Sequence, residues 1–146
     1  MNVDEAVAAG AAIYAGLQSK TDLNEAQKKA IESVKLQDVC NFYLGTLVME
    51  EDPVLNRRVP ANLILIDRDT ALPARKVKRL ETLEDDQEAI SIEITQSEGR
   101  EKNREFVNII HEGRLEFPDK KPKGRAIDVT YVYDTSGKLH CTFTDA

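Results

Sequence analysis

The side chains that most often carry chemistry in proteins are rare in this sequence of 146 residues. Histidine occurs only as His111 and His140, and cysteine only as Cys40 and Cys141. Zinc ligands usually come in pairs roughly two to five residues apart, and these four are not spaced in that way. Two cysteines are also too few for a disulfide framework. We therefore expect two buried thiols that behave as small apolar side chains in a reducing compartment.

The densest group of carboxylates lies at residues 84–88, which read EDDQE. A calcium loop alternates its ligands around a central glycine, and this stretch does not, so we expect a solvated loop. His140 falls on the polar face of a strand pattern and His111 in a charged stretch, which favours a structural role for both. An enzyme needs a nucleophile with a base, paired carboxylates in a cleft, or a metal. The sequence predicts no catalytic residue and no metal site.

Composition narrows the class of ligand. The chain is 41% apolar and 32% charged, which is typical of a soluble globular protein, and its formal net charge is -6. Nucleic acids and anionic membranes attract clustered Lys and Arg, so neither is an expected partner. A basic or apolar ligand fits better. The first residues carry acids where a secretory signal needs bases, and no apolar run approaches the roughly 20 residues that span a bilayer, so we expect a cytoplasmic protein.

Two periodicities divide the chain. Residues 1–37 read as one or two helices: Asp4 and Glu5 stand where acids favour a helix start, and an alanine-rich run follows. Its small side chains suit close packing against a larger body. A second helix is expected over residues 23–34, with Thr21 or Asp22 near its N-cap.

After Asp38 the apolar residues alternate with a period of two, which predicts strands at residues 90–95, 127–133 and 139–143, and a hairpin turn at 134–137. Residues 63–66 predict a strand buried on both sides, and residues 77–82 a less regular strand. Pro60, Pro73, Pro118 and Pro122 are expected between strands. The fold class predicted is mainly β, an antiparallel β-sandwich preceded by one or two N-terminal helices.

A series of short motifs follows the order of one known family. The motifs are Asp4-Glu5-Ala6-Val7-Ala8, Asp38-Val39, Leu44-Gly45, Thr70-Ala71-Leu72-Pro73, residues 87–96, Pro122-Lys123-Gly124, and Asp134 with Gly137 and Leu139. Together they resemble the seventy-kilodalton heat-shock chaperones, DnaK and its relatives. The junction at Asp38-Val39-Cys40 is more similar to the HscC branch than to DnaK itself.

The resemblance implies an arrangement of domains. Residues 1–37 would be the last helix of an ATPase domain with a helical linker, and residues 38–146 the substrate-binding β-sandwich. In a full-length parent Asp4 would lie near the ribose of ATP, a J-domain co-chaperone would be a partner, and ATP would drive a stress-response chaperone. We expect this chain to be a fragment of that parent, with no cofactor of its own.

The resemblance also implies site residues for unfolded or extended polypeptides. The family's peptide pocket corresponds to Thr46, Met49, Leu80, Leu83, Ile90 and Ile92, and its gate to Asp85 with Lys123. Leu80 would form the pocket wall and Leu83 the arch over the peptide. From the residues alone, ordinary core positions explain the same apolar side chains.

Some features depart from the family. The linker positions 34–37 are half polar, residues 50–62 form a longer and more charged segment, and a lysine replaces the gate's arginine. The acids at 50–52 and 84–88 favour peptides flanked by Lys or Arg if they border the site, and serve solubility if they do not. The N-terminal arm, by which we mean the apolar, alanine-rich helix expected within residues 1–37, predicts self-association. An alternative function is a specialised interaction or scaffold domain with a single partner.

Overall fold

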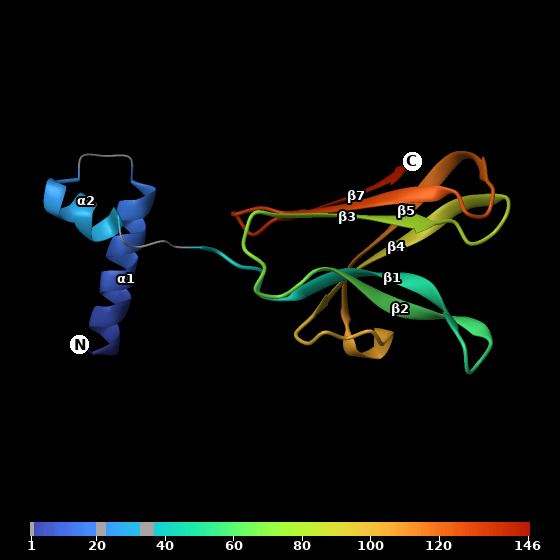
Figure 1. The fold of residues 1–146 in the computed structure, drawn as a ribbon, viewed down its shortest axis with the longest axis horizontal. Helices are drawn as coiled ribbons and strands as arrows, with labels where there is room; N and C mark the ends of the chain where they lie inside the picture. Colours follow the sequence, from blue (N-terminus) through green and yellow to red (C-terminus); the bar gives the residue numbers. More distant parts are fainter. Residues whose placement is uncertain (1, 20–22, 33–36) are drawn as a thin grey trace. The chain divides into compact units, whose positions relative to one another are not determined.

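The computed structural model describes residues 2–19, 23–32 and 37–146 (Figure 1). The chain divides into two compact units, Met1–Gln37 and Asp38–Ala146. The first contains helices α1 (Val3–Gln18) and α2 (Glu25–Glu32). The second contains β1 (Tyr43–Asp52), β2 (Arg57–Ile66), β3 (Ala74–Glu81), β4 (Gln87–Ser97), the 3-10 turn η1 (Arg104–Phe106), β5 (Asn108–Lys121), β6 (Ala126–Tyr133) and β7 (Leu139–Asp145). The expectations for Thr21, Asp22 and the linker positions 34–36 lie outside the described residues.

Both helices begin with reciprocal side-chain caps. The Asn2 side chain accepts from the Glu5 amide at 2.8 Å, and the Glu5 carboxylate accepts from the Asn2 amide at 3.3 Å. Asn24 and Gln27 make the same exchange at the start of α2. The second helix is therefore capped at Asn24. Within the described part of the chain, neither helix is long and apolar enough to cross a membrane.

Two antiparallel sheets form the second unit. One has the strand order β2-β1-β4-β5 and the other β3-β6-β7. Alternate side chains of both sheets point inward, as the period of two requires. The buried core consists of Cys40, Leu44, Ile66, Leu72, Ala74, Ile94, Phe117, Ile127, Val129 and Tyr131. The predicted fold class is confirmed: the protein is mainly β, with a sandwich that follows N-terminal helices.

A buried hydrogen bond joins the two sheets. Tyr131 on β6 is completely buried, and its hydroxyl donates to the Gly45 carbonyl oxygen on β1 at 2.7 Å. A side chain at Gly45 would collide with the Leu63 carbonyl oxygen of β2. Glycine at this position therefore lets β1 approach β2 closely while its carbonyl faces the opposite sheet.

Two proline predictions were wrong. Pro60 lies inside β2 and Pro118 inside β5, rather than between strands. Both belong to edge strands of the four-stranded sheet, where a missing N–H can face away from the neighbouring strand. The same edge position corrects a second prediction, that residues 63–66 form a strand buried on both sides. Only Ile66 of these four residues is fully buried.

The two cysteines are free thiols in different surroundings. Cys40 is buried, and its thiol donates to the Phe42 carbonyl at 3.0 Å. Cys141 on β7 is only half-buried, although burial still raises its pKa to about 11. Burial also raises the pKa of Cys40. Both thiols are protonated at neutral pH, which fits small apolar side chains better than nucleophiles.

Candidate functional site

The four-stranded sheet opens between its two middle strands, β1 and β4. Strands β1 and β4 pair from Tyr43↔Ser97 to Thr46↔Ile94 and no further. Beyond that point β1 stays paired with β2 as far as Asp52, and β4 stays paired with β5 back to Gln87. Residues 47–52 and residues 87–93 therefore have a strand neighbour on one side only. We call the region between these two edges the open seam (Figure 1).

The Thr46 side chain marks where the seam begins. Its hydroxyl donates to the Glu93 carbonyl at 2.9 Å, one residue beyond the last paired residue of β4. Thr46 is 2% exposed, so this bond is shielded from water. Val48 follows two residues later and shares the same face of β1, because side chains alternate along a strand. It is half-buried, and the sequence analysis did not identify it.

Apolar side chains gather beside the seam. Leu80 on β3 and Ile90 and Ile92 on β4 are half-buried and pack against the main core. Met49, in contrast, is 43% exposed and lies outside that cluster, opposite Pro60 on β2. Three of the predicted pocket residues thus pack against the same core, and Met49 stands apart at the β1 edge.

The fifth predicted apolar residue, Leu83, lies in the turn between β3 and β4 and is held through its backbone. Its amide donates to the Gln87 side-chain oxygen at 3.1 Å, and its carbonyl accepts from Arg58 of β2 at 3.3 Å. Arg58 comes from the four-stranded sheet, while Leu83 follows two residues after the end of β3, a strand of the other sheet. This contact therefore joins the β1–β2 hairpin to the β3–β4 turn.

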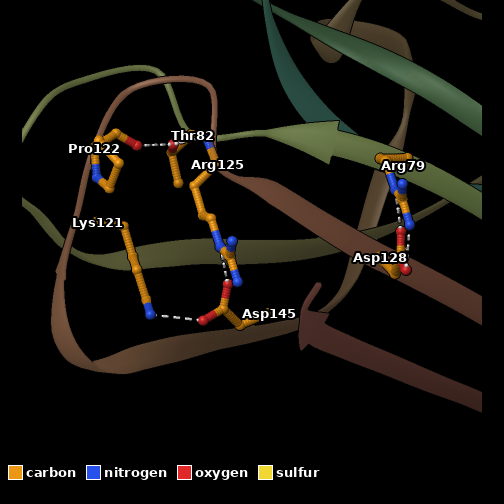
Figure 2. Close-up of polar contacts among 7 residues, drawn as sticks. All are labelled: Arg79, Thr82, Lys121, Pro122, Arg125, Asp128 and Asp145. Atoms are coloured by element: carbon orange, nitrogen blue, oxygen red, sulfur yellow. Dashed lines mark hydrogen bonds and ion pairs between the residues drawn. The ribbon is translucent and has the colours of Figure 1, made fainter.

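Thr82 anchors that turn from the other side (Figure 2). Its hydroxyl donates to the Pro122 carbonyl at 2.6 Å and accepts from the Arg125 amide at 2.9 Å. Its backbone amide donates to Arg125 and its carbonyl accepts from Gly124, each at 2.9 Å. Thr82 is 3% exposed, so four hydrogen bonds from one buried residue fix the position of Leu83, its neighbour.

The predicted gate residues meet, but not through their charges. The Asp85 carboxylate accepts from the backbone amide of Lys123 at 2.9 Å. The ammonium group of Lys123 makes no ion pair with Asp85 among the described residues. A backbone donor is present whatever side chain stands at position 123, so the exchange of arginine for lysine leaves this contact in place.

Ion pairs secure the same end of the sandwich (Figure 2). Asp145 of β7 contacts Lys121 at 2.7 Å and Arg125 at 2.8 Å, and these donors hold its pKa below the ordinary value, Lys121 first. The Arg79 guanidinium makes a bidentate contact with the Asp128 carboxylate, at 2.7 and 3.0 Å. This contact lowers the pKa of Asp128 as well. These pairs tie β3, β5, β6 and β7 together behind the turn.

A shallow hollow of about 400 Å³ lies over the acidic turn, bordered by residues 84–91 and Arg114. Ile90 is the one predicted pocket residue that lines it. In the part of the chain that the structure describes, no three His, Cys, Asp or Glu side chains gather as metal ligands would.

The sequence model of the family described as Hsp70 protein matches residues 1–146, the whole chain. The chain belongs to the Hsp70 protein family. Membership supports a chaperone-type function and confirms the family that the motifs predicted. The match is to the family as a whole, so the HscC-like branch stays a prediction.

The resemblance assigns residues 1–37 to the last helix of an ATPase domain plus a helical linker, and it places Asp4 of that helix near ATP. Asp4 is an exposed carboxylate in the first turn of α1, and α1 has no buried residue. A single exposed carboxylate does not make a nucleotide site. The role of Asp4 toward ATP therefore stays a prediction for a longer protein.

Proposed function

We propose that residues 38–146 form a peptide-binding domain of a Hsp70-type molecular chaperone, which holds extended apolar segments of unfolded proteins along the open seam. One observation carries this proposal: β1 and β4 part after Thr46↔Ile94 and leave two open backbone edges, one of which carries Ile90 and Ile92. An extended chain uses such edges for main-chain hydrogen bonds, while apolar side chains beside them select what it carries.

This arrangement supports weak and reversible binding. Backbone hydrogen bonds depend little on peptide sequence, so one site accepts many segments. Burial of one leucine-sized side chain contributes about 1.5 to 3 kcal/mol. The gain is offset in part by ordering the peptide and the side chains it contacts.

Charge favours a subset of peptides. Glu50 is paired with Lys102 and Glu88 with Lys120, whereas the exposed acids Glu84, Asp85 and Asp86 of the turn make no ion pair among the described residues. Their field favours apolar segments flanked by Lys or Arg. Peptide arrays with acidic and basic flanks exchanged around one apolar core test this. Equal affinity for the two sets would remove the charge preference and leave the seam proposal intact.

The longer protein and its setting are part of the proposal. In a full-length parent ATP binding and hydrolysis would drive peptide exchange, a J-domain co-chaperone would be a partner, and the cytoplasm would be the compartment.

We also propose that the N-terminal arm mediates self-association, because Val3, Val7 and Tyr14 of α1 are 79%, 67% and 49% exposed. Sedimentation velocity over a hundredfold range of concentration tests the arm; a constant monomer rejects it.

The experiment that tests peptide binding is fluorescence anisotropy with a panel of unrelated, extended apolar peptides. We expect micromolar binding of several of them, and about fivefold weaker binding by Ile90→Thr. That substitution keeps the branched shape and removes about 1 kcal/mol of apolar contact. Ile110→Thr is the matched control, because Ile110 lies on β5 and is 48% exposed. Equal loss in both variants contradicts the assignment of Ile90.

A scaffold domain with a single partner is the second candidate, and the β1–β2 hairpin favours it. Val54 and Leu55 at its tip are 88% and 53% exposed. The Asp52 carboxylate accepts from both of their amides, at 2.8 and 3.0 Å, and so holds the tip in a defined shape. If the peptide panel gives no binding at all, the chaperone proposal fails and this hairpin becomes the surface to test.

A further inference from the structure

Strand β3 carries a concentration of positive charge that the proposed function does not use. Its sequence is ARKVKRLE, so four of its eight residues are basic, in a chain whose formal net charge is -6. Residues 75–79 are all exposed, whereas a strand that covers a core buries every second residue. Arg79 is held by Asp128 of β6 at 2.7 Å (Figure 2). The other three basic residues make no ion pair among the described residues.

The backbone of β3 is also open along one side. The strand lies at the edge of the three-stranded sheet and pairs with β6 in an unbroken register. Just beyond its end, the Thr82 amide donates to the Arg125 carbonyl, and the Thr82 carbonyl accepts from the Gly124 amide. The direction of the backbone N–H and C=O groups alternates along a strand. The backbone groups of the odd-numbered residues in 75–79 therefore point away from β6, toward the free edge.

Two lysines of this edge lie on the side of β3 that faces the core. Lys76 is opposite Tyr131 of β6, which is 0% exposed, and opposite residues share one face of a sheet. Lys78 is opposite Val129, which is equally buried. Both lysines are exposed, so their ammonium groups reach water beside the sheet edge. An apolar strand added here would cover these charges, and a second copy of β3 would set basic residues against each other.

We propose that the free edge of β3 over residues 75–79 binds an extended acidic segment of a partner protein by strand addition. The unpaired backbone groups supply the main-chain hydrogen bonds that such a segment needs. Its carboxylates lie beside Arg75 on one face and beside Lys76 and Lys78 on the other, because side chains alternate along the added strand as well. The acidic turn at residues 84–88 repels the segment beyond the end of β3. This edge belongs to the sheet that does not contain the open seam, so the proposal stands independently of peptide binding there.

Fluorescence anisotropy with labelled peptides of about ten residues, long enough for one strand, tests this edge. Glutamate alternates with threonine in the first peptide, and glutamine replaces every glutamate in the second. A third peptide repeats the first with its backbone amides methylated, which removes strand hydrogen bonds and keeps the charge.

The variant that tests the edge is Lys76→Gln combined with Lys78→Gln. Its matched control is Lys29→Gln combined with Arg57→Gln, which removes the same charge from exposed residues of α2 and β2. Thermal unfolding first shows that both variants fold, and the three peptides test the unmodified protein without any variant.

We expect the glutamate peptide to bind the unmodified protein at low salt, and the glutamine and methylated peptides to bind at least about fivefold more weakly. The lysine variant should lose about fivefold in affinity for the glutamate peptide, and the control less than about twofold. Absence of binding, equal affinity for the methylated peptide, or equal loss in both variants overturns the proposal.

Two competitors separate this edge from other sites. Displacement of the glutamate peptide by an excess of apolar peptide would place it in the open seam and reject the β3 edge. A single-stranded oligonucleotide or an anionic vesicle that binds more tightly than the peptide, and loses affinity in the lysine variant, would also reject it, because phosphate would then be the preferred ligand. We expect neither result.

Discussion

Thr82 offers the sharpest mutational test of how the β3–β4 turn is held. Thr82→Val keeps the branched shape and removes the hydroxyl, so the Pro122 carbonyl and the Arg125 amide each lose a partner. A hydrogen bond contributes about 0.5–1.5 kcal/mol net, and the loss of two gives about 1–3 kcal/mol. Water reaches the exposed turn at residues 122–125, and the new methyl group is buried. We therefore expect the free energy of unfolding to fall by about 2 kcal/mol.

Urea unfolding measures this cost, with Thr144→Val as the control. Thr144 is exposed and its hydroxyl reaches the Asp128 carbonyl at 3.4 Å, so we expect its loss to cost less than about 0.5 kcal/mol. The reasoning is refuted if the two variants lose the same stability. Peptide affinity is the second readout: because Thr82 positions Leu83, Thr82→Val should weaken binding under conditions where it remains fully folded.

Three further predictions concern the frame of the site. Gly45→Ala should destabilise the protein by about 1–3 kcal/mol in urea unfolding, because its new methyl group meets the Leu63 carbonyl. Tyr131→Phe removes the hydrogen bond between the sheets and should lower the free energy of unfolding by about 1–2 kcal/mol; an unchanged midpoint contradicts this. The pKa of Asp145 lies below its ordinary 3.8, mainly through Lys121, so its stabilising effect is present above that value and lost as the pH falls. Asp145→Asn should therefore flatten the loss of stability between about pH 5 and pH 2, and an unaltered slope would falsify the assignment.

Alternation predicted the strands that face the core on one side. Residues 127–133 and 139–143 became β6 and β7, and residues 90–95 became the middle of β4. β5 was missed because it is an edge strand whose side chains are mostly exposed, from Asn108 to Lys121, so its apolar residues show no clear period. Proline misled for the same reason, since an edge strand tolerates what a central strand does not.

The site residues also differ in whether the sequence alone could reveal them. Leu80, Ile90 and Ile92 were found through the family motifs, and the structure places all three against one core. Val48 could have been found from Thr46 by the alternation of β1. Arg58 gives no local signal, because its partner Leu83 lies 25 residues away in the β3–β4 turn and the contact depends on how the fold brings that turn to β2.

Backbone contacts escaped the sequence analysis altogether. Asp85 was paired with the charge of Lys123, and the structure pairs it with the Lys123 amide instead. Thr82 carries no motif of its own, and its importance comes from four bonds to a turn about 40 residues further along the chain. Side-chain chemistry is visible in a sequence, while the position of a main-chain donor becomes visible only when the fold is known.

The central claim is that an extended peptide lies along the open seam, and hydrogen exchange read at single-residue resolution tests it most directly. With a saturating apolar peptide, the account predicts slower exchange of amides in residues 47–52 and 87–93, the two edges without a second strand neighbour. Peptide binding that leaves both edges unchanged and protects amides elsewhere, such as the hairpin tip at residues 53–56, would contradict it.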